Sequence, residues 1–204
     1  MSAPDAPQFD EARIVQVLDR HGVAYVLVGG LGALLHGASR PTLDFDLCAA
    51  WDLDNLGRLV DALRELGAEL RVRPGVQPPT VDAHLLHDSV VTTWRTAAGD
   101  IDVLVGIPSS PQAGLNRFDS LRGRAEARVV AGCTVYVAAL ADIIASKRVA
   151  NRPADREALP ELEALADQQA PDAEPERPLP TRWQPPGPYP EPPTSSGPGQ
   201  FPER

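Results

Sequence analysis

The chain of 204 residues contains two cysteines, one methionine and no long hydrophobic run. Cys48 and Cys133 are too few for a disulfide-built domain, and no Cys/His cluster has the spacing of a zinc site. No apolar run approaches the roughly 20 residues that a membrane-spanning helix needs. The N-terminal segment MSAPDAPQFDEAR carries acids and lacks the apolar centre of a secretory signal. We therefore expect a reduced, cytoplasmic protein that does not associate with a membrane.

Positive charge is also scarce, and the formal net charge is −9. Residues 158–204 hold eight acids and three arginines, so more than half of the negative excess lies near the C-terminus. An acidic balance excludes indiscriminate nucleic-acid binding but leaves room for a local basic patch. The hydrophobic share of 43% is typical of a globular domain.

The composition changes from about Pro171 onward, where more than half of the 22 prolines lie among glycine, serine and glutamate. Proline removes backbone donors, and the apolar residues here are too few to build a core. We predict a folded domain over residues 8–168 and a disordered, Pro-rich acidic tail over residues 169–204. Trp183, Tyr189 and Phe201 leave open a partner-binding motif in this tail, although an inert tail is the simpler interpretation.

Helical and strand patterns alternate along the domain. Helical periodicity is found over residues 9–21, 52–66, 140–150 and 155–166, with a shorter helix over 30–37. Strand patterns cover residues 23–28, 43–49, 69–72, 89–97 and 101–107, and two short strands, 129–130 and 134–137, flank Gly132. Hairpins among alternating helices and strands predict an α/β (α+β) fold, in which a mixed sheet is flanked by helices.

Two glycines, Gly29 and Gly30, come after the first predicted strand. They do not fit the dinucleotide-binding fingerprint, because the third glycine would fall on Leu35, and no Gly-Lys-Ser/Thr sequence is present. A Gly-Gly turn still lets the backbone approach a ligand, and a helix after it offers free N–H groups to an anion. Such a turn is structural more often than functional, so its role depends on the residues near it.

Paired carboxylates come after the glycines. Asp44 and Asp46 are two residues apart on a predicted strand and therefore share one face. Asp100 and Asp102 repeat this spacing on another strand, with Asp102 between apolar neighbours. Side-by-side or buried carboxylates are costly unless a cation holds them, and structural ion pairs are the alternative. We predict that Asp44, Asp46 and Asp102 bind Mg²⁺ or Mn²⁺ for chemistry on phosphate.

The segment VGGLGALLHGASRPTLDFDL resembles the signature of the DNA polymerase β-type nucleotidyltransferase superfamily. That signature is a Gly-Gly or Gly-Ser turn, an Asp-x-Asp strand and a third aspartate on a neighbouring strand. More narrowly, the order Gly-Gly, His-Gly, Arg-x-Thr and Asp-x-Asp resembles the bacterial AbiEii/MenT-like toxin nucleotidyltransferases, as does the later segment LADIIASKRVANRPADREAL. The resemblance spans roughly residues 10–165 and leaves out the tail.

This resemblance implies the polymerase β-type fold and roles for individual residues. Gly29 and Gly30 would approach the triphosphate of a bound NTP. Asp44 and Asp46 would ligate the metal that joins triphosphate and protein. Asp102 would help to hold a second metal or act as a base on the attacking hydroxyl. The reaction implied is in-line displacement at the α-phosphorus, which moves an NMP to an acceptor hydroxyl (EC 2.7.7 type).

The resemblance also implies an acceptor and partners. A toxin-like enzyme of this kind would modify RNA at a tRNA 3′ end and would have a cognate antitoxin. Transfer to a protein hydroxyl or to a small-molecule hydroxyl such as that of an antibiotic stays open, and so does a catalytically silent nucleotide-binding module. The intact set of three aspartates counts against a silent module.

Lys147 is the only lysine among 19 basic residues. A compact ammonium suits a single phosphate oxygen, whereas arginine presents a wide planar fork. Because Lys147 lies in the later segment that resembles the toxins, we predict that it binds the nucleotide phosphates. Arg40 and Arg152 are further nucleotide-binding candidates, and Asp155 would orient Arg152 or Lys147.

Other polar residues have less specific interpretations. We expect His36 to form a structural hydrogen bond near the glycine turn beside it, and we expect His84 and His87 to lie in a polar loop. A run of arginines would suit an RNA phosphate backbone, although such a run is more often a solvated face. Its members are Arg117, Arg122, Arg124 and Arg128, with Arg71 and Arg73 as an extension.

Overall fold

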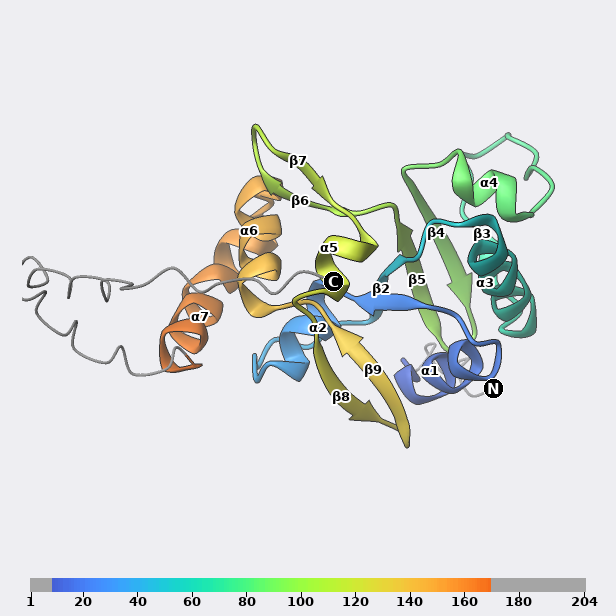
Figure 1. Ribbon diagram of the computed structural model, residues 1–204. Coiled ribbons are helices and arrows are strands. Elements are labelled where there is room, and N and C mark those ends of the chain that lie inside the picture. Colours follow the sequence, from blue (N-terminus) through green and yellow to red (C-terminus); the bar gives the residue numbers. More distant parts are fainter. Residues whose placement is uncertain (1–8, 170–204) are drawn as a thin grey trace, which may run out of the picture. The chain divides into compact units, whose positions relative to one another are not determined.

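The computed structural model describes residues 9–169 (Figure 1). The predicted tail lies outside these residues from residue 170 onward. The helices are α1 (Glu11–Arg20), α2 (Gly29–Leu35), α3 (Leu53–Glu65), α4 (Ala83–His87), α5 (Phe118–Arg122), α6 (Leu140–Ala150) and α7 (Pro153–Gln169). The strands are β1 (Tyr25–Leu27), β2 (Asp44–Ala49), β3 (Glu69–Leu70), β4 (Val91–Thr96), β5 (Gly99–Leu104), β6 (Ile107–Ser110), β7 (Gly114–Asn116), β8 (Glu126–Val130) and β9 (Cys133–Val137).

The strands of the described residues form a mixed seven-stranded sheet in the order β3-β4-β5-β2-β1-β9-β8 and a two-stranded ribbon of β6 and β7. Strand β2 runs parallel to β5 and β1 runs parallel to β9, whereas the other neighbouring pairs are antiparallel. The mixed sheet with flanking helices confirms the fold class predicted from the sequence. The two predicted hairpins are also confirmed, as β4–β5 and β8–β9.

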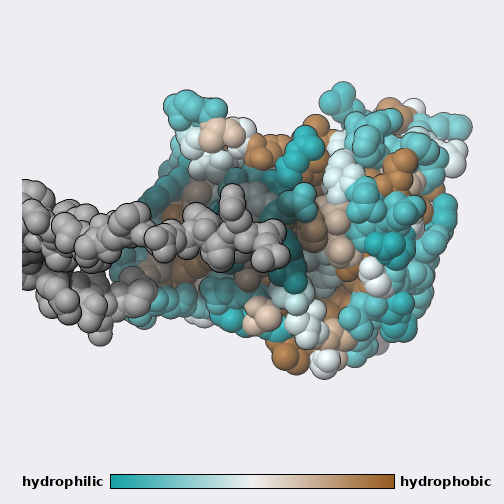
Figure 2. All heavy atoms as spheres, in the orientation of Figure 1, coloured by the Kyte–Doolittle hydropathy of each residue, from teal (hydrophilic) through white to brown (hydrophobic). Residues whose placement is uncertain are grey.

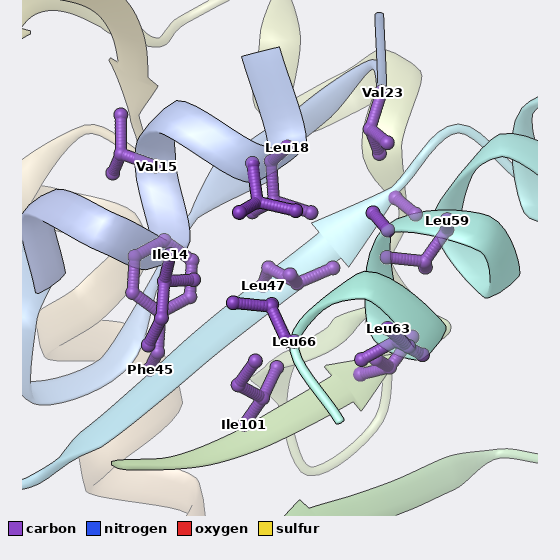
Figure 3. Close-up of a cluster of buried hydrophobic side chains, with 14 of the residues drawn as sticks. Ile14, Val15, Leu18, Val23, Phe45, Leu47, Leu59, Leu63, Leu66 and Ile101 are labelled. Atoms are coloured by element: carbon purple, nitrogen blue, oxygen red, sulfur yellow. The ribbon is translucent and has the colours of Figure 1, made fainter. Parts of the chain in front are cut away.

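Side-chain alternation along the central strands separates two apolar layers. On one face of the sheet, Phe45, Leu47 and Ile101 pack against buried residues of α1 and α3 (Figure 3). On the other face, Val26 and Cys48 pack against α2, α5, α6 and α7. The aspartates of β2 and β5 alternate with the first set and therefore face the second group of helices.

Aspartate side chains cap the N-termini of α1 and α3. The Asp10 carboxylate accepts a hydrogen bond from the backbone N–H of Arg13 at 3.0 Å and begins α1. Asp52, predicted as an N-cap, accepts one from the N–H of Asn55 at 2.8 Å and begins α3. Each cap satisfies a backbone donor that a helix start leaves free.

Short elements were missed by the sequence patterns. His84 and His87 lie on α4, so the prediction of a polar loop around them is wrong. The helix is capped by Asp82, whose carboxylate accepts from the N–H of Leu85 at 2.9 Å. Leu86 is its one buried residue, and a single buried residue produces no helical period in the sequence. Helix α5 also escaped prediction and is likewise five residues long.

The predicted strand over 101–107 is divided in the structure. Strand β5 ends at Leu104, and Ile107 begins β6 of the separate ribbon. Between them the chain passes so close to β7 that a Cβ on Gly106 would lie 2.6 Å from the carbonyl oxygen of Asn116. The apolar pattern of residues 101–107 contains no sign of this approach.

Some large apolar side chains of the described residues are exposed. The large apolar side chains that are most exposed, Leu43, Val90 and Val129, lie on different parts of the chain. Hydrophilic residues predominate over α3 and α4 in the view of Figure 2. Within residues 9–169, no helix has the length and apolar character that crossing a membrane requires.

Asn55 is a fully buried amide that ties α3 to the ends of β1 and β2. Its Nδ2 donates to the carbonyl oxygens of Ala24 at 2.9 Å and Ala50 at 3.0 Å. Its Oδ1 accepts from the N–H of Ala24 at 2.8 Å and from Arg58 Nη2 at 3.0 Å. The amide therefore uses its full hydrogen-bonding capacity inside the protein.

We expect Asn55→Ala to lower the free energy of unfolding by about 3 kcal/mol, because it leaves buried backbone groups without partners. Asp61→Ala on the same helix removes an exposed ion pair with Arg64 and should change stability by less than about 0.5 kcal/mol. Urea denaturation of both variants measures the difference. Equally small losses in the two variants would show that the Asn55 contacts contribute little.

Candidate active site

Three of the predicted carboxylates gather where β2 and β5 run side by side. The parallel register places Asp46 opposite Asp102 and Asp44 opposite Asp100. Asp44, Asp46 and Asp102 line one cavity of about 510 Å³. Asp100 does not line this cavity, and its Oδ2 instead accepts from Arg71 Nη1 at 2.9 Å. The structure thus brings together the three aspartates that the sequence singled out.

The negative charges in this cluster repel one another. Burial, and then the charges of Asp102 and Asp44, raise the pKa of Asp46 from 3.8 to about 6. A hydrogen bond from the backbone of Gly30 and the charge of Lys147 oppose this rise. Burial and the neighbouring carboxylates also raise the pKa of Asp44. The cluster is therefore a place where added positive charge would be stabilising.

The donor set fits a divalent cation. Asp102 Oδ1 is buried and has no hydrogen-bond partner within the described residues. Together with Asp44 and Asp46 it offers only oxygen donors, which Mg²⁺ and Mn²⁺ prefer. Among residues 9–169, no three His, Cys, Asp or Glu side chains already form a cage for a metal ion.

The Gly-Gly turn passes directly beside Asp46. Gly29 has a φ of +64°, and a Cβ added to it would collide with the Asp46 carboxylate. A Cβ on Gly30 would lie 2.9 Å from the side chain of Thr42. Both positions therefore require glycine for close packing. Gly30 lines the cavity and Gly29 does not, so Gly29 acts on the site by making room for Asp46.

Two cations meet on one buried carboxylate across the cavity. Lys147 Nζ lies 3.2 Å from Asp155 Oδ1, and Arg152 Nε lies 2.8 Å from Asp155 Oδ2. Burial raises the pKa of Asp155, but hydrogen bonds from Arg152 and Lys147 outweigh it and hold the pKa below its usual range. The Lys147 side chain is 17% exposed and that of Arg152 is 73% exposed. Asp155 therefore orients both cations.

Arg40, in the loop between α2 and β2, also lines the cavity. Its Nη1 donates to Glu157 Oε2 at 2.9 Å and to the carbonyl oxygen of Ala154 at 3.3 Å, both on α7. Arg40, Lys147 and Arg152 all line the cavity that the three aspartates line. Cations and carboxylates thus line the same cavity, a combination that can hold a polyphosphate together with its counter-cation.

His36 lies outside this cavity. Its side chain is fully buried, and Nε2 lies 2.8 Å from the carbonyl oxygen of Ala138. This contact ties the end of α2 to the segment that leads into α6. A structural role for His36 agrees with the sequence-based expectation.

Three arginines of the proposed strip form contacts with other side chains of the protein. Arg124 forms a two-point contact with Asp142, at 3.1 Å from Nε and 2.8 Å from Nη2. Arg128 pairs with Glu126 at 2.6 Å. The guanidinium of Arg122 lies 3.2 Å from the centre of the Tyr136 ring. These contacts leave less of the strip available for an RNA backbone than its sequence spacing suggests.

Part of the cavity wall was not found by sequence reasoning. It comes from α2, from the loop after it and from the first three turns of α7. The missed lining residues are Ala33, Ala38, Pro41, Thr42, Leu43, Ala154, Ala158, Glu161 and Leu162. Once Asp155 is placed in the site, the spacing of three and four residues along α7 would have indicated Ala158, Glu161 and Leu162.

The raised pKa of Asp46 predicts that its ionisation lowers the free energy of unfolding in a pH-dependent way. Because the folded-state pKa lies above the unfolded value of 3.8, the ionised carboxylate destabilises the protein above about pH 6, and the cost is relieved as pH falls toward 4. In metal-free buffer, Asp46→Asn should raise the free energy of unfolding at pH 7.5 by about 1–2 kcal/mol, with no gain near pH 4. Denaturation of Asp46→Asn and of the exposed control Asp167→Asn at both pH values tests this. A gain of equal size at both pH values would contradict it.

No family model matches the sequence, and no curated protein matches it. Among solved structures, a lincosamide antibiotic adenylyltransferase, LnuA, aligns with a TM-score of 0.52 at 14% identity, over 78% of this chain and 99% of that chain. The adenylyltransferase ANT(2")-Ia, solved with adenylyl-2"-tobramycin, aligns with a TM-score of 0.45 at 16% identity, over 76% and 92%. An antigenic nucleotidyltransferase-like protein from Paracoccidioides brasiliensis aligns with a TM-score of 0.43 at 16% identity, over 76% and 73%.

At these identities the likeness concerns the fold, and the alignment with LnuA is the one whose TM-score exceeds 0.5 among these three. That alignment spans nearly the whole of the other chain. The narrower resemblance to AbiEii/MenT-like toxins stays a prediction. The mixed sheet with its flanking helices therefore has the nucleotidyltransferase fold.

Proposed function

We propose that this protein is a metal-dependent nucleotidyltransferase that moves an NMP from an NTP to an acceptor hydroxyl and releases pyrophosphate. One observation carries the proposal. Asp44, Asp46 and Asp102, on adjacent strands, share a cavity with the cations Lys147 and Arg152. The catalytic unit in this proposal is the domain over residues 8–168.

In this proposal, the cations that line the cavity bind the phosphates of the NTP. Lys147 presents a compact charge held in place by Asp155, so it can bind one phosphate oxygen without first being ordered. Arg152 shares the same anchor and is mostly exposed, so its guanidinium can turn toward the triphosphate. Gly30 lines the cavity and its backbone donates a hydrogen bond to Asp46, so in this proposal the phosphates approach the carboxylates past a residue without a side chain.

The chemical step joins the acceptor oxygen to the α-phosphorus. The bond between the α-phosphorus and its bridging oxygen breaks, and pyrophosphate leaves with that oxygen. In this proposal Asp102, which lines the cavity, would receive the proton of the attacking hydroxyl or help to hold a second metal ion. Asp44, Asp46 and Asp102 would hold Mg²⁺ or Mn²⁺, which supplies charge neutralisation on the phosphate oxygens.

An RNA acceptor, specifically a tRNA 3′ end, is the first proposal for the acceptor. The Arg-x-Thr motif that resembles the AbiEii/MenT-like toxins lines the cavity through Arg40 and Thr42. This supports the toxin-like version of the function and, with it, a cognate antitoxin as a partner. The same observation suits any acceptor that enters beside the loop after α2.

A small-molecule hydroxyl is the second proposal, and a different observation favours it. Arg122, Arg124 and Arg128 are engaged within the protein, which weakens a strip that would follow an RNA backbone. The structural relative LnuA is an adenylyltransferase of lincosamide antibiotics. A protein hydroxyl is the remaining acceptor class, and a labelling experiment separates the three.

Transfer should depend on Asp46. Incubated with Mg²⁺ and each of the four α-labelled NTPs, the protein should label one class of acceptor in a mixture of total tRNA, cell protein and aminoglycoside and lincosamide antibiotics. Asp46→Asn should reduce this label by about 100-fold or more, because a metal-binding carboxylate is lost. Asp100→Asn, on β5 but outside the cavity, should keep most of the activity.

The labelled band identifies the acceptor. Label on tRNA supports the toxin-like enzyme, label on protein indicates modification of a protein hydroxyl, and label on an antibiotic supports the second proposal. Label that survives Asp46→Asn undiminished would refute the proposed metal site. Failure to label any acceptor, combined with NTP binding by calorimetry, would favour a silent nucleotide-binding module.

Removal of the single lysine should weaken NTP use. Lys147→Ala is expected to lower kcat/KM for the NTP by about tenfold or more, since one charge-assisted contact to phosphate is lost. Arg148→Ala, its neighbour, removes an exposed pair with Glu163 and should leave kcat/KM nearly unchanged. Initial rates over a range of NTP concentrations measure both. Equal rates in the two variants would place Lys147 outside the phosphate site.

A further inference from the structure

The sheet continues past the cavity as an open face on β5 and β4. Residues that pair across neighbouring strands point to the same face. Thr93 of β4 pairs with Asp102, and Arg95 pairs with Asp100, so both lie on the face that carries the aspartates. Thr93 is half-buried and Arg95 is exposed, whereas Trp94 between them is buried in the layer of α1 and α3. Helices therefore cover the other face of β4 and leave this one accessible to a ligand.

Two arginines lie on this open face beside the carboxylates. Arg71 comes directly after β3, its Nη1 lies 2.9 Å from Asp100 Oδ2, and its side chain is 50% exposed. Glu69 lies opposite Arg95 in the register of β3 and β4. Even so, no ion pair joins Arg95 to another side chain of residues 9–169. Both guanidinium groups therefore retain N–H donors for a ligand on a surface outside the cavity.

The geometry of the proposed reaction relates this face to the acceptor. In-line displacement at phosphorus places the attacking oxygen opposite the leaving oxygen. The cations assigned to the phosphates lie on α6 and just before α7, and β4 lies on the other side of β2 from these helices (Figure 1). A hydroxyl that attacks opposite the pyrophosphate therefore arrives from the β4 side. Two strand spacings of about 4.8 Å separate β2 from β4, so the last nucleotides of a strand that ends at Asp46 would pass over Arg95.

We propose that the open face of β5 and β4 binds the acceptor and that this acceptor is the single-stranded end of an RNA, a role that rests on the proposed function. Arg71 and Arg95 contact its phosphates, because a guanidinium fork matches phosphate oxygens. An exposed sheet face suits an extended strand, whereas small molecules bind in concave sites that enclose most of their surface. These arginines are separate from Arg122, Arg124 and Arg128, which contact other side chains of the protein.

Fluorescence anisotropy of total tRNA labelled at its 5′ end tests this in the full-length protein with Mg²⁺. Arg95→Ala should weaken binding by about tenfold, since one charge-assisted contact to phosphate is lost. The slope of log Kd against log salt concentration should also fall by about 0.7, the value for one phosphate contact to a single strand. Arg71→Ala should have the same two effects. Arg13→Ala removes an exposed arginine of α1, which packs on the other face of the sheet, and should match the wild type.

Calorimetry with non-hydrolysable α,β-methylene analogues of the four NTPs separates two failures, and thermal melting verifies that each variant is folded. Weaker tRNA binding and a smaller salt slope in Arg95→Ala, with unchanged binding of the analogues, support the acceptor surface. Failure of the wild type to bind tRNA, or equal tRNA binding by Arg95→Ala and Arg13→Ala, overturns the acceptor surface while nucleotide binding stands. Binding of none of the four analogues to the wild-type protein overturns the proposed function, and the acceptor surface with it.

Discussion

Repulsion between carboxylates on two parallel strands is the constraint on which the site depends. The register of β2 and β5 sets Asp46 opposite Asp102, and burial adds to the cost of charge there. A folded protein retains such an arrangement when a cation or a substrate group offsets it. The glycine at position 29 serves the same cluster, because a side chain there would occupy the place of the Asp46 carboxylate.

The cations of the cavity are organised by a buried carboxylate, Asp155, whose pKa is lowered where that of Asp46 is raised. Asp155 is almost fully buried, yet hydrogen bonds from Lys147 and Arg152 keep it ionised in preference to neutral. It joins the C-terminal part of α6 to the first turn of α7, so the helix pair and the cations are positioned together (Figure 1). The result is one cavity that is lined by both carboxylates and cations.

Much of the fold could be predicted from local pattern, since the long helices and the two hairpins have strong periodicity or turn signals. The short helix α4 could not, because Leu86 alone is buried and leaves no period. The break after β5 could not either, because the close approach of Gly106 to Asn116 of β7 leaves no mark on the apolar run. Within the site, spacing identified Asp44, Asp46 and Asp102, and the scarcity of lysine identified Lys147. Ala158, Glu161 and Leu162 carry no signal of their own and follow only from their spacing to Asp155 along α7.

The sequence by itself determined which residue types could meet: acids at strand spacing place their side chains on one face, and glycines permit close approach of the backbone. Only the tertiary structure determined which of these side chains contact one another. Because of the strand order, Asp102 lies beside Asp46, and Asp100 forms an ion pair with Arg71. The tertiary structure also drew arginines of the predicted strip into internal contacts with Asp142 and Glu126. The reason is physical: alternation and capping act within a few residues, whereas ion pairing and burial depend on which distant segments pack together.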